Sequence, residues 1–451
     1  MGSMLKLLTL AVGGALLAGC GQVAQITPEN RMCNFVQYPL KVDAPPGHSV
    51  DDGELSPFAT AIEQSLAAHD VKFGRGDHPK VLSFSGGSEH GAFGAGILKG
   101  WGGDGDVPDL QVVTGISTGS ILSTFAFVDR ADLAVDGYTI ERESQLINVY
   151  AKPTDGKPGP ANFLSLIRKG AFGDLDPLRT RIGSYLTEDI MREVVWRHEE
   201  GRRLFVGVVD ADSGQGAAFD MGDMAKRYTT NHQGKAEQWK DCYISAIIAS
   251  SSTPMAAPPV FIDNIMYVDG GVRFGLFGDD VIKVFKRRNA AREEDANAPD
   301  APVVYAVVNG TLTLPPPACP KEDPSLCTED RPLGPPEGQH KNWNIMELAL
   351  RSERILVNQV FRFSADSVEA EACEGSGCFN FLRIDPDVEE FRIALPNPLN
   401  GGDVENLTCP QWKAIDIKAD NPIEFHKRYM RCLIAYGDSK VGQSRWGFPD
   451  S

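Results

Sequence analysis

The segment Gly115-Ile116-Ser117-Thr118-Gly119 constrains the fold of this chain more than any other. It fits the pattern G-x-S-x-G and stands between an apolar run, Leu110 to Val113, and an apolar stretch that we expect to be helical, Ile121 to Val128. A strand that turns sharply into a helix presents a serine at the tip of the turn, and flanking glycines avoid clashes there. The following helix directs its N–H groups and dipole toward negative charge. The segment therefore predicts an α/β fold with Ser117 as a candidate nucleophile.

A second glycine-rich turn, Ser85-Gly86-Gly87-Ser88, precedes this segment. It follows the short apolar run Val81 to Phe84 and comes before a predicted helix, Ala92 to Trp101. Such a turn leaves backbone N–H groups free to bind a phosphate or an oxyanion. Its spacing does not fit the G-x-G-x-x-G pattern of dinucleotide sites. Gly86, Gly87 and Ser88 are therefore candidate donors of an oxyanion hole.

The third signal is Tyr267-Val268-Asp269-Gly270-Gly271, in which an acid ends an expected strand, Ile265 to Val268. An Asp-Gly pair alone indicates no more than a turn. Its place after the glycine-rich turn and the serine segment makes Asp269 a candidate base.

These three motifs, in this order and rough spacing, resemble the patatin-like phospholipases. The resemblance covers about residues 79–310, and the stretches Val208 to Gly214 and Ala249 to Pro254 support it. It implies a three-layer αβα sandwich with a mainly parallel central sheet, and a Ser–Asp dyad that needs no metal and no cofactor. Ser117 would attack an ester carbonyl of a membrane phospholipid or lysophospholipid, and Asp269 would accept its proton. Burial would raise the pKa of such a carboxyl, which makes it a better base.

Two residues depart from the family pattern. Ser88 stands where the family often has a third glycine, and His90 where it often has Arg or Lys. We expect Ser88 to donate through its backbone and His90 to be solvated or structural rather than catalytic.

The N-terminus has the pattern of an export signal. Met1-Gly2-Ser3 resembles a cloning scar, and an apolar run, Leu7 to Leu17, is followed by Ala18-Gly19-Cys20. The run is too short for a membrane-spanning helix. Leu17 to Cys20 resembles a bacterial lipobox, which implies that residues 1–19 are removed and that Cys20 is acylated. We therefore expect a protein anchored by lipid in the bacterial cell envelope, with Gly21 favouring the outer membrane.

Charge and cysteine content set further limits. The formal net charge of −17 argues against a nucleic-acid partner, because phosphate backbones favour clustered Lys and Arg. Nine cysteines leave eight besides Cys20, an even number that suggests disulfides in an exported chain. Proximity in the sequence favours the pairs Cys319–Cys327 and Cys373–Cys378. The pairs Cys409–Cys432 and Cys33–Cys242 would complete the set, although the sequence leaves other pairings open.

The motifs also divide the chain. Residues 20–78 read as a lipidated tether and N-terminal extension, and residues 79–451 as the catalytic domain, with a less typical, cysteine-containing part at 315–451. Residues 150–180 and 315–340 are candidate lids, because long loops often cover such sites.

Two alternatives remain open. An α/β-hydrolase triad would use His340 or His426, which come late in the chain as that fold requires, although we expect both at the surface. A non-catalytic surface lipoprotein could keep the same fold as a binding scaffold. The lipid head group, the chain length, the sn position, the balance of hydrolysis and acyl transfer and the oligomeric state are left open too.

Overall fold

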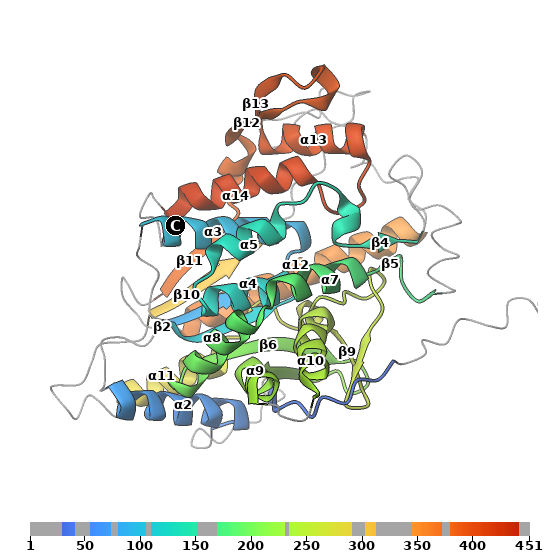
Figure 1. Cartoon of the computed structure of the whole chain (residues 1–451). Helices are drawn as coiled ribbons and strands as arrows, with labels where there is room; N and C mark the ends of the chain where they lie inside the picture. The colour runs from blue at the N-terminus through green and yellow to red at the C-terminus, as the bar shows by residue number, and fades with distance from the viewer. Residues whose placement is uncertain are drawn as a thin grey trace, which may run out of the picture.

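A nine-stranded sheet forms the centre of the computed structural model, which describes residues 29–40, 55–73, 80–104, 110–150, 169–230, 234–290, 303–312, 345–371 and 379–441 (Figure 1). The strands run in the order β1-β7-β6-β3-β2-β10-β11, and β9 pairs with β6 and β8. Their bounds are β1 (Gln37–Leu40), β2 (Lys80–Phe84), β3 (Leu110–Ile116), β6 (Arg203–Asp210), β7 (Gly216–Asp220), β8 (Val260–Ile262), β9 (Ile265–Asp269), β10 (Val303–Val308) and β11 (Phe379–Arg383).

The middle of the sheet is parallel. Strands β11, β10, β2, β3 and β6 pair parallel in turn, whereas β1, β7, β8 and β9 add antiparallel partners on the β6 side. All seven residues of β3 are buried, as expected for a central strand that is covered on both faces. Parallel strands end at one edge of the sheet, so the turns that follow β2 and β3 lie next to each other there.

Helices cover both faces of the sheet. Leu82 and Phe84 of β2 face one helical layer, and Val81, just before them, faces the other, as the alternation of side chains along a strand requires. The first layer contains α3 (Gly91–Asp104), α4 (Thr118–Phe127), α5 (Ala131–Tyr138), α7 (Asp176–Tyr185), α8 (Glu188–Glu199), α9 (Met221–Thr230), α10 (Ala236–Ser250), α13 (Cys409–Asp420) and α14 (Lys427–Val441). The second contains α2 (Pro57–Phe73), α11 (Asp279–Ala290) and α12 (Ile345–Glu371). The predicted αβα sandwich with a mainly parallel central sheet is confirmed.

The C-terminal residues pack on the first helical layer. Helix α14 lies along α3, and α13 and the hairpin β12 (Arg392–Pro396) and β13 (Val404–Thr408) continue outward from it at the top of Figure 1. A disulfide between Cys409 and Cys432 joins α13 to α14. That predicted pair is confirmed.

The N-terminal extension is also fixed to the domain. The predicted disulfide between Cys33 and Cys242 is confirmed, and it ties the extension to α10. The Asp263 carboxylate accepts hydrogen bonds from the backbone N–H groups of Cys33, Asn34 and Phe35, at 2.7, 2.8 and 3.1 Å. Residues 37–40 then add β1 to the edge of the sheet.

Several expectations fall outside the described residues: the signal segment and Cys20, the pairs Cys319–Cys327 and Cys373–Cys378, His340, the candidate lid 315–340 and residues 151–168 of the other lid. Among the helices that the structure describes, none has the length and apolar character needed to cross a membrane.

Candidate active site

Ser117 occupies the turn between β3 and α4. Its backbone has φ 54° and ψ −127°, a strained conformation for a residue with a side chain, and it precedes the first residue of α4. The serine is 9% exposed. The glycines on either side of the serine allow this tight turn, because each lies against other backbone where a side chain would clash. A Cβ on Gly119 would lie 2.6 Å from the carbonyl oxygens of Phe84 and Ser85. The predicted strand, tight turn and helix around Ser117 are confirmed.

Ser250, the last residue of α10, supports the strained turn. Its Oγ accepts a hydrogen bond from the Ser117 N–H at 2.8 Å and donates to the Gly207 carbonyl of β6 at 2.7 Å. Both contacts are buried, so each polar backbone group is satisfied away from water. Ser250 lies in the stretch that supports the family resemblance, yet the motif alone indicates no role for it.

Asp269 ends β9 beside Ser117, and its carboxylate is 3% exposed. Oδ1 accepts a hydrogen bond from the Gly271 N–H at 2.7 Å, and Oδ2 accepts one from the Thr253 hydroxyl at 2.9 Å. Burial raises the pKa of Asp269 to about 6, although hydrogen bonds from the Ser117 hydroxyl, the Gly271 N–H and Thr253 act in the opposite direction. The Ser117 hydroxyl is thus close enough to the Asp269 carboxylate to lower its pKa.

The glycine-rich turn lies against Ser117. A Cβ on Gly86 would come within 2.9 Å of the Ser117 Cβ and 3.6 Å of its Oγ. Gly87 has φ 151°, and Ser88 has φ 52° in the left-handed region, where residues other than glycine are strained. Within the described part of the chain, the N–H groups of Gly86 and Gly87 have no hydrogen-bond acceptor. They are free to bind an anion beside the Ser117 hydroxyl.

Asn309, just after β10, holds this turn in place. Its backbone N–H donates to the Ser85 Oγ at 2.8 Å, and its side-chain amide donates to the Ser85 carbonyl at 2.8 Å. Its Oδ1 accepts a hydrogen bond from the Gly94 N–H of α3 at 3.1 Å. Asn309 is fully buried. No local sequence pattern indicates a role for this residue.

A threonine and a tyrosine join the two turns. Thr118, next to Ser117, donates its hydroxyl to the Ser88 carbonyl at 3.1 Å, and it also contacts the Tyr138 hydroxyl. Tyr138 in turn donates to the Thr118 carbonyl at 3.1 Å. The serine turn and the glycine-rich turn therefore form one connected unit.

One comparison with known proteins finds a match in the part of the chain that contains these motifs. Residues 82–277 match the family model described as patatin-like phospholipase. Residues 82–277 belong to the patatin-like phospholipase family. The family acts on lipids as acyl-hydrolases, and the matched range contains Ser117, Asp269 and the glycine-rich turn.

Two further comparisons concern solved structures and curated proteins. The crystal structure of VipD from Legionella pneumophila aligns with 79% of this chain and 67% of that one, at 10% sequence identity and a TM-score of 0.32. No curated protein matches the chain.

Residues beyond the matched range also support the candidate active site. Glu89, which follows the glycine-rich turn, is buried, and its Oε2 lies 2.8 Å from the His426 Nδ1 and accepts the His426 backbone N–H at 3.0 Å. Its Oε1 accepts a hydrogen bond from the Lys413 Nζ at 2.8 Å. Burial by itself would raise the pKa of Glu89, but the His426 hydrogen bond and the Lys413 charge hold it at about 2.

Two expectations about histidines are tested by this cluster. The expectation that His426 lies at the surface was wrong: its side chain is 7% exposed because the buried Glu89 carboxylate requires a partner. His90 is half-buried, and its ring meets that of Tyr429 edge-on at 6.0 Å. Burial lowers the pKa of His90 to about 4, so this imidazole is neutral at pH 7. Among the described residues, no histidine hydrogen bonds to Ser117 or Asp269.

Helix α12, in the second helical layer, borders the candidate active site. Phe361 packs beside Gly86, Gly271 and Gly275, and the Ser364 Oγ accepts the Gly275 N–H at 2.8 Å. The pKa of the Glu353 carboxyl is raised mainly by burial, with Arg354 acting in the opposite direction and the charges of Glu424 and Asp269 adding to the rise. Through Phe361 and Ser364, the inner side of α12 lies against the glycine-rich turn and the segment that follows Asp269.

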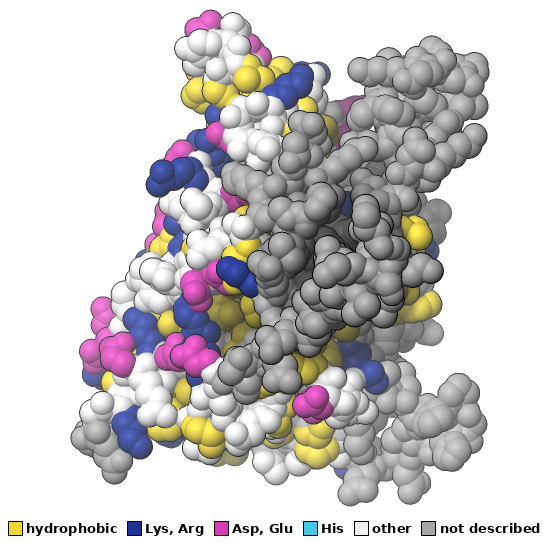
Figure 2. Space-filling model, turned by 90° about the vertical axis from the view of Figure 1, so that its right-hand side faces the viewer, with side chains coloured by type: hydrophobic (Ala, Val, Ile, Leu, Met, Phe, Trp, Pro, Cys, Tyr) yellow, Lys and Arg dark blue, Asp and Glu magenta, His cyan; other side chains and the backbone are white. Residues whose placement is uncertain are grey.

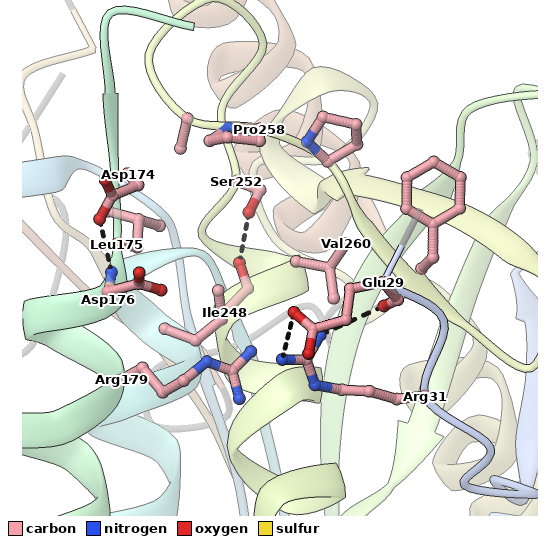
Figure 3. A pocket seen from close by; sticks show the side chains of 13 residues that line it. Glu29, Arg31, Asp174, Leu175, Asp176, Arg179, Ile248, Ser252, Pro258 and Val260 are labelled. Carbon is pink, nitrogen blue, oxygen red and sulfur yellow. Dashed lines mark hydrogen bonds and ion pairs between the residues drawn. The ribbon is translucent and has the colours of Figure 1, made fainter. Parts of the chain in front are cut away.

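A separate pocket of about 190 Å³ is lined in part by Ile248, Ser252 and Val260 (Figure 3). Arg31 and Arg179 project into it from opposite sides, and both bond to Asp241, at 2.8 and 2.6 Å. Ser117 and Asp269 are not among its lining residues. Because Asp241 neutralises part of the charge of the arginines, we assign this pocket no role in the chemistry.

Proposed function

We propose that this chain hydrolyses ester-linked fatty acids from membrane phospholipids or lysophospholipids through a dyad of Ser117 and Asp269. The observation that carries the proposal is a serine in a strained turn beside a buried carboxyl whose pKa is raised to about 6. Near pH 7 such a carboxyl is ionised and is a stronger base than an exposed aspartate.

The proposed reaction has two halves. Asp269 accepts the proton of Ser117 as Oγ attacks the ester carbonyl, and the charge that develops on the carbonyl oxygen is stabilised by N–H groups of Gly86, Gly87 and Ser88. Asp269 then returns the proton to the departing alcohol, leaving the acyl group on Ser117. In the second half Asp269 takes a proton from water as the water attacks the acyl-enzyme. It returns this proton to the Ser117 Oγ as the bond between Oγ and the acyl group breaks, which releases the fatty acid and restores both residues.

The position of His426 supports the dyad over a triad. Its Nδ1 is committed to Glu89, and it makes no hydrogen bond to Asp269 or Ser117. The scaffold alternative is less favoured, because Ser117 and Asp269 are both present and in contact.

The test is the release of fatty acid from phosphatidylcholine and lysophosphatidylcholine by purified variants. We expect Ser117→Ala to lower the rate by about 10⁴-fold or more. Asp269→Asn should have a similar effect, while His340→Ala keeps the wild-type rate and His426→Ala keeps a measurable part of it. Activity that survives Asp269→Asn but is abolished by His340→Ala or His426→Ala would establish the triad. A folded wild type that releases no fatty acid from either lipid would favour the scaffold.

We also propose that Cys20 is acylated and anchors the chain to the cell envelope. The support is the lipobox-like segment Leu17 to Cys20 after an apolar run. Incorporation of labelled palmitate by wild type but not by Cys20→Ser would bear this out, and equal incorporation would refute it.

A further inference from the structure

The Phe361 side chain of α12 faces both members of the proposed dyad. A Cβ added to Gly86 would lie 3.4 Å from the Phe361 Cζ and 3.6 Å from the Ser117 Oγ. A Cβ added to Gly271 would lie 3.8 Å from the Phe361 Cε1 and 3.0 Å from the Asp269 Oδ1. The ring is therefore separated from the serine hydroxyl and from the carboxylate by no more than the space that a single side-chain carbon with its contacts would fill.

The position of this ring is fixed by the backbone around it. A Cβ on Gly275 would lie 2.5 Å from the Phe361 Cα, so only glycine lets α12 come this close to the segment that carries Gly275. The Ser364 Oγ, three residues further along α12, accepts the Gly275 N–H at 2.8 Å. The side-chain amide of Asn358, three residues before the ring, donates to the Thr311 carbonyl at 3.0 Å. The ring therefore cannot move away from the dyad without the loss of these contacts.

Apolar side chains surround the ring on the side away from the dyad. Phe361 is 9% exposed and belongs to a buried cluster in the second helical layer, against β10 and β11. Every other buried member of that cluster is apolar as well, among them Leu276, Val308 and Phe381. Val357, one turn before Phe361 on the same face of α12, packs against the cluster. The second helical layer thus meets the dyad with apolar surface, and the Phe361 ring is the part of it next to Ser117.

The first helical layer meets the same site with charged groups. The Glu89 carboxylate, next to the glycine-rich turn, bonds to Lys413 through one oxygen and to His426 through the other. On α12 the carboxyl that senses the charge of the site, Glu353, lies about two turns before Phe361. An ester of a fatty acid has an apolar chain on one side of the carbonyl and a polar alcohol on the other. The two sides of the site therefore fit the two halves of such an ester.

The face of the molecule on which α12 begins displays both kinds of surface. It is the right-hand side of Figure 1 and is turned to the viewer in Figure 2. Apolar side chains are visible there in a hollow, and acidic and basic side chains lie beside it. Apolar surface on this face is therefore not confined to the buried core.

We propose that the Phe361 ring forms one wall of the subsite for the acyl chain and sets the preference for chain length. In the acyl-enzyme the carbonyl carbon is bonded to the Ser117 Oγ, and the next carbons of the chain lie against the ring at an apolar contact distance of about 4 Å. The alcohol leaves on the side of Glu89. This role rests on the proposed function and adds to it the direction in which the ester lies. Phe361 stands outside residues 82–277, so the family match assigns it no role.

The turnover test compares p-nitrophenyl octanoate with p-nitrophenyl acetate, and its readout is the ratio of their kcat/KM values. We expect Phe361→Ala to lower this ratio about tenfold, because the methylenes of the longer chain lose an apolar contact. Phe361→Leu keeps part of the contact and should lower the ratio about threefold, so the test does not depend on a folded alanine variant. The control, Phe381→Ala, removes a ring of the same buried cluster from β11, which β10 and β2 separate from β3. It should leave the ratio within about twofold of the wild-type value.

A purely structural ring would give a different result. Loss of packing alone lowers the hydrolysis of both esters alike, so an unchanged ratio in the Phe361 variants would overturn the proposal. An equal fall of the ratio in Phe381→Ala would overturn it too, since a loosened cluster would then explain both. Circular dichroism melting shows which variants are folded.

A binding test is independent of turnover. Dodecanoate is titrated calorimetrically into the full chain with Ser117→Ala, alone or combined with Phe361→Ala, Phe361→Leu or Phe381→Ala. We expect Phe361→Ala to raise the Kd about tenfold and Phe381→Ala to leave it within about twofold. A wild type that hydrolyses neither ester would refute the proposed function, and the rise in Kd would then still support the acyl subsite. Equal Kd values for the Phe361 and Phe381 variants would overturn the subsite whether or not the esters are hydrolysed.

Discussion

His426 and Glu89 lie 337 residues apart in the chain, and their side chains meet in a buried contact of 2.8 Å between Nδ1 and Oε2. Glu89 immediately follows the glycine-rich turn, and His426 immediately precedes α14. Lys413 of α13 contacts the other oxygen of the same carboxylate, and the disulfide Cys409–Cys432 joins the two helices. The C-terminal helices therefore position the turn whose N–H groups face Ser117.

The first prediction concerns His426. His426→Ala removes one of the partners of the buried Glu89 carboxylate, so we expect the free energy of unfolding to fall by about 2–3 kcal/mol. The turn also loses support, so kcat should fall about tenfold with a smaller change in KM. His426→Asn, which keeps a donor near the Nδ1 position, should recover part of both. Lys99→Ala breaks an exposed ion pair with Asp438 and serves as the control, with an expected cost under about 1 kcal/mol. An Ala variant with wild-type kcat would show that Glu89 and His426 do not position the turn.

The second prediction concerns pH. Asp269 accepts a proton only when it is ionised, and its pKa is raised to about 6, so kcat/KM should fall as the pH drops through 6. The pKa of Glu89 is lowered to about 2, so the stability that this group contributes is fully present above its unfolded value near 4.5 and is lost only as the pH falls from there toward 2. The lowered pKa of His90 costs some stability as the pH falls from about 6.5 toward 4, so the fold weakens in the same range. Activity should nevertheless decline reversibly as the pH drops through 6, before the protein unfolds. Rates and circular dichroism measured on the same samples would check this. Loss of activity that coincides with unfolding would speak against Asp269 as the titrating base.

The third prediction concerns Ser250. Ser250→Ala leaves the Ser117 N–H without an acceptor and the Gly207 carbonyl without its donor, so the free energy of unfolding should fall by about 1–3 kcal/mol. The turn also relaxes, and kcat should fall with it. Ser252→Ala is the matched control, because the Ser252 hydroxyl bonds only to the Ile248 carbonyl one helical turn earlier. Denaturant melts and ester hydrolysis should separate the two variants, and equal behaviour would argue that Ser250 is not needed for the strained turn.

The fourth prediction concerns Gly87. A Cβ at this position would lie 1.9 Å from the Asn309 carbonyl oxygen, and the φ of 151° is itself unfavourable for alanine. Gly87→Ala should displace the turn and lower kcat about a hundredfold or more, the usual effect of losing an oxyanion donor. Gly102→Ala, in α3, meets only an ordinary contact of 3.7 Å and should be neutral or slightly stabilising. Wild-type turnover by the Gly87 variant would exclude this turn from catalysis.

The sequence predicted the elements whose signals are local. The strand, turn and helix around Ser117 lie within one short stretch, as do the apolar run, the glycine-rich turn and the helix that became β2, the turn after it and α3. Asp269 was found through motif order rather than through any signal in its own neighbourhood. Cys33 and Cys242 were paired correctly from the small set of cysteines that remained.

What the sequence could not supply are contacts between distant segments. Asn309 reaches Ser85, and Ser250 reaches Ser117, only after β10 and α10 are placed beside the serine turn. His426 was expected at the surface because it does not lie in a loop at the end of an expected strand, whereas its partner, Glu89, becomes buried only when α14 packs on α3. The two members of a buried polar pair hydrogen bond to each other although they are far apart in the chain, so neither has a recognisable local sequence pattern.

The proposed mechanism depends most on Ser117 as the nucleophile. Reaction of the folded protein with a fluorophosphonate, followed by intact mass and peptide mapping, tests this directly. We predict a single adduct on Ser117, none on Ser117→Ala, and slower labelling of Asp269→Asn. An adduct on another residue, or no adduct on wild type, would contradict the account.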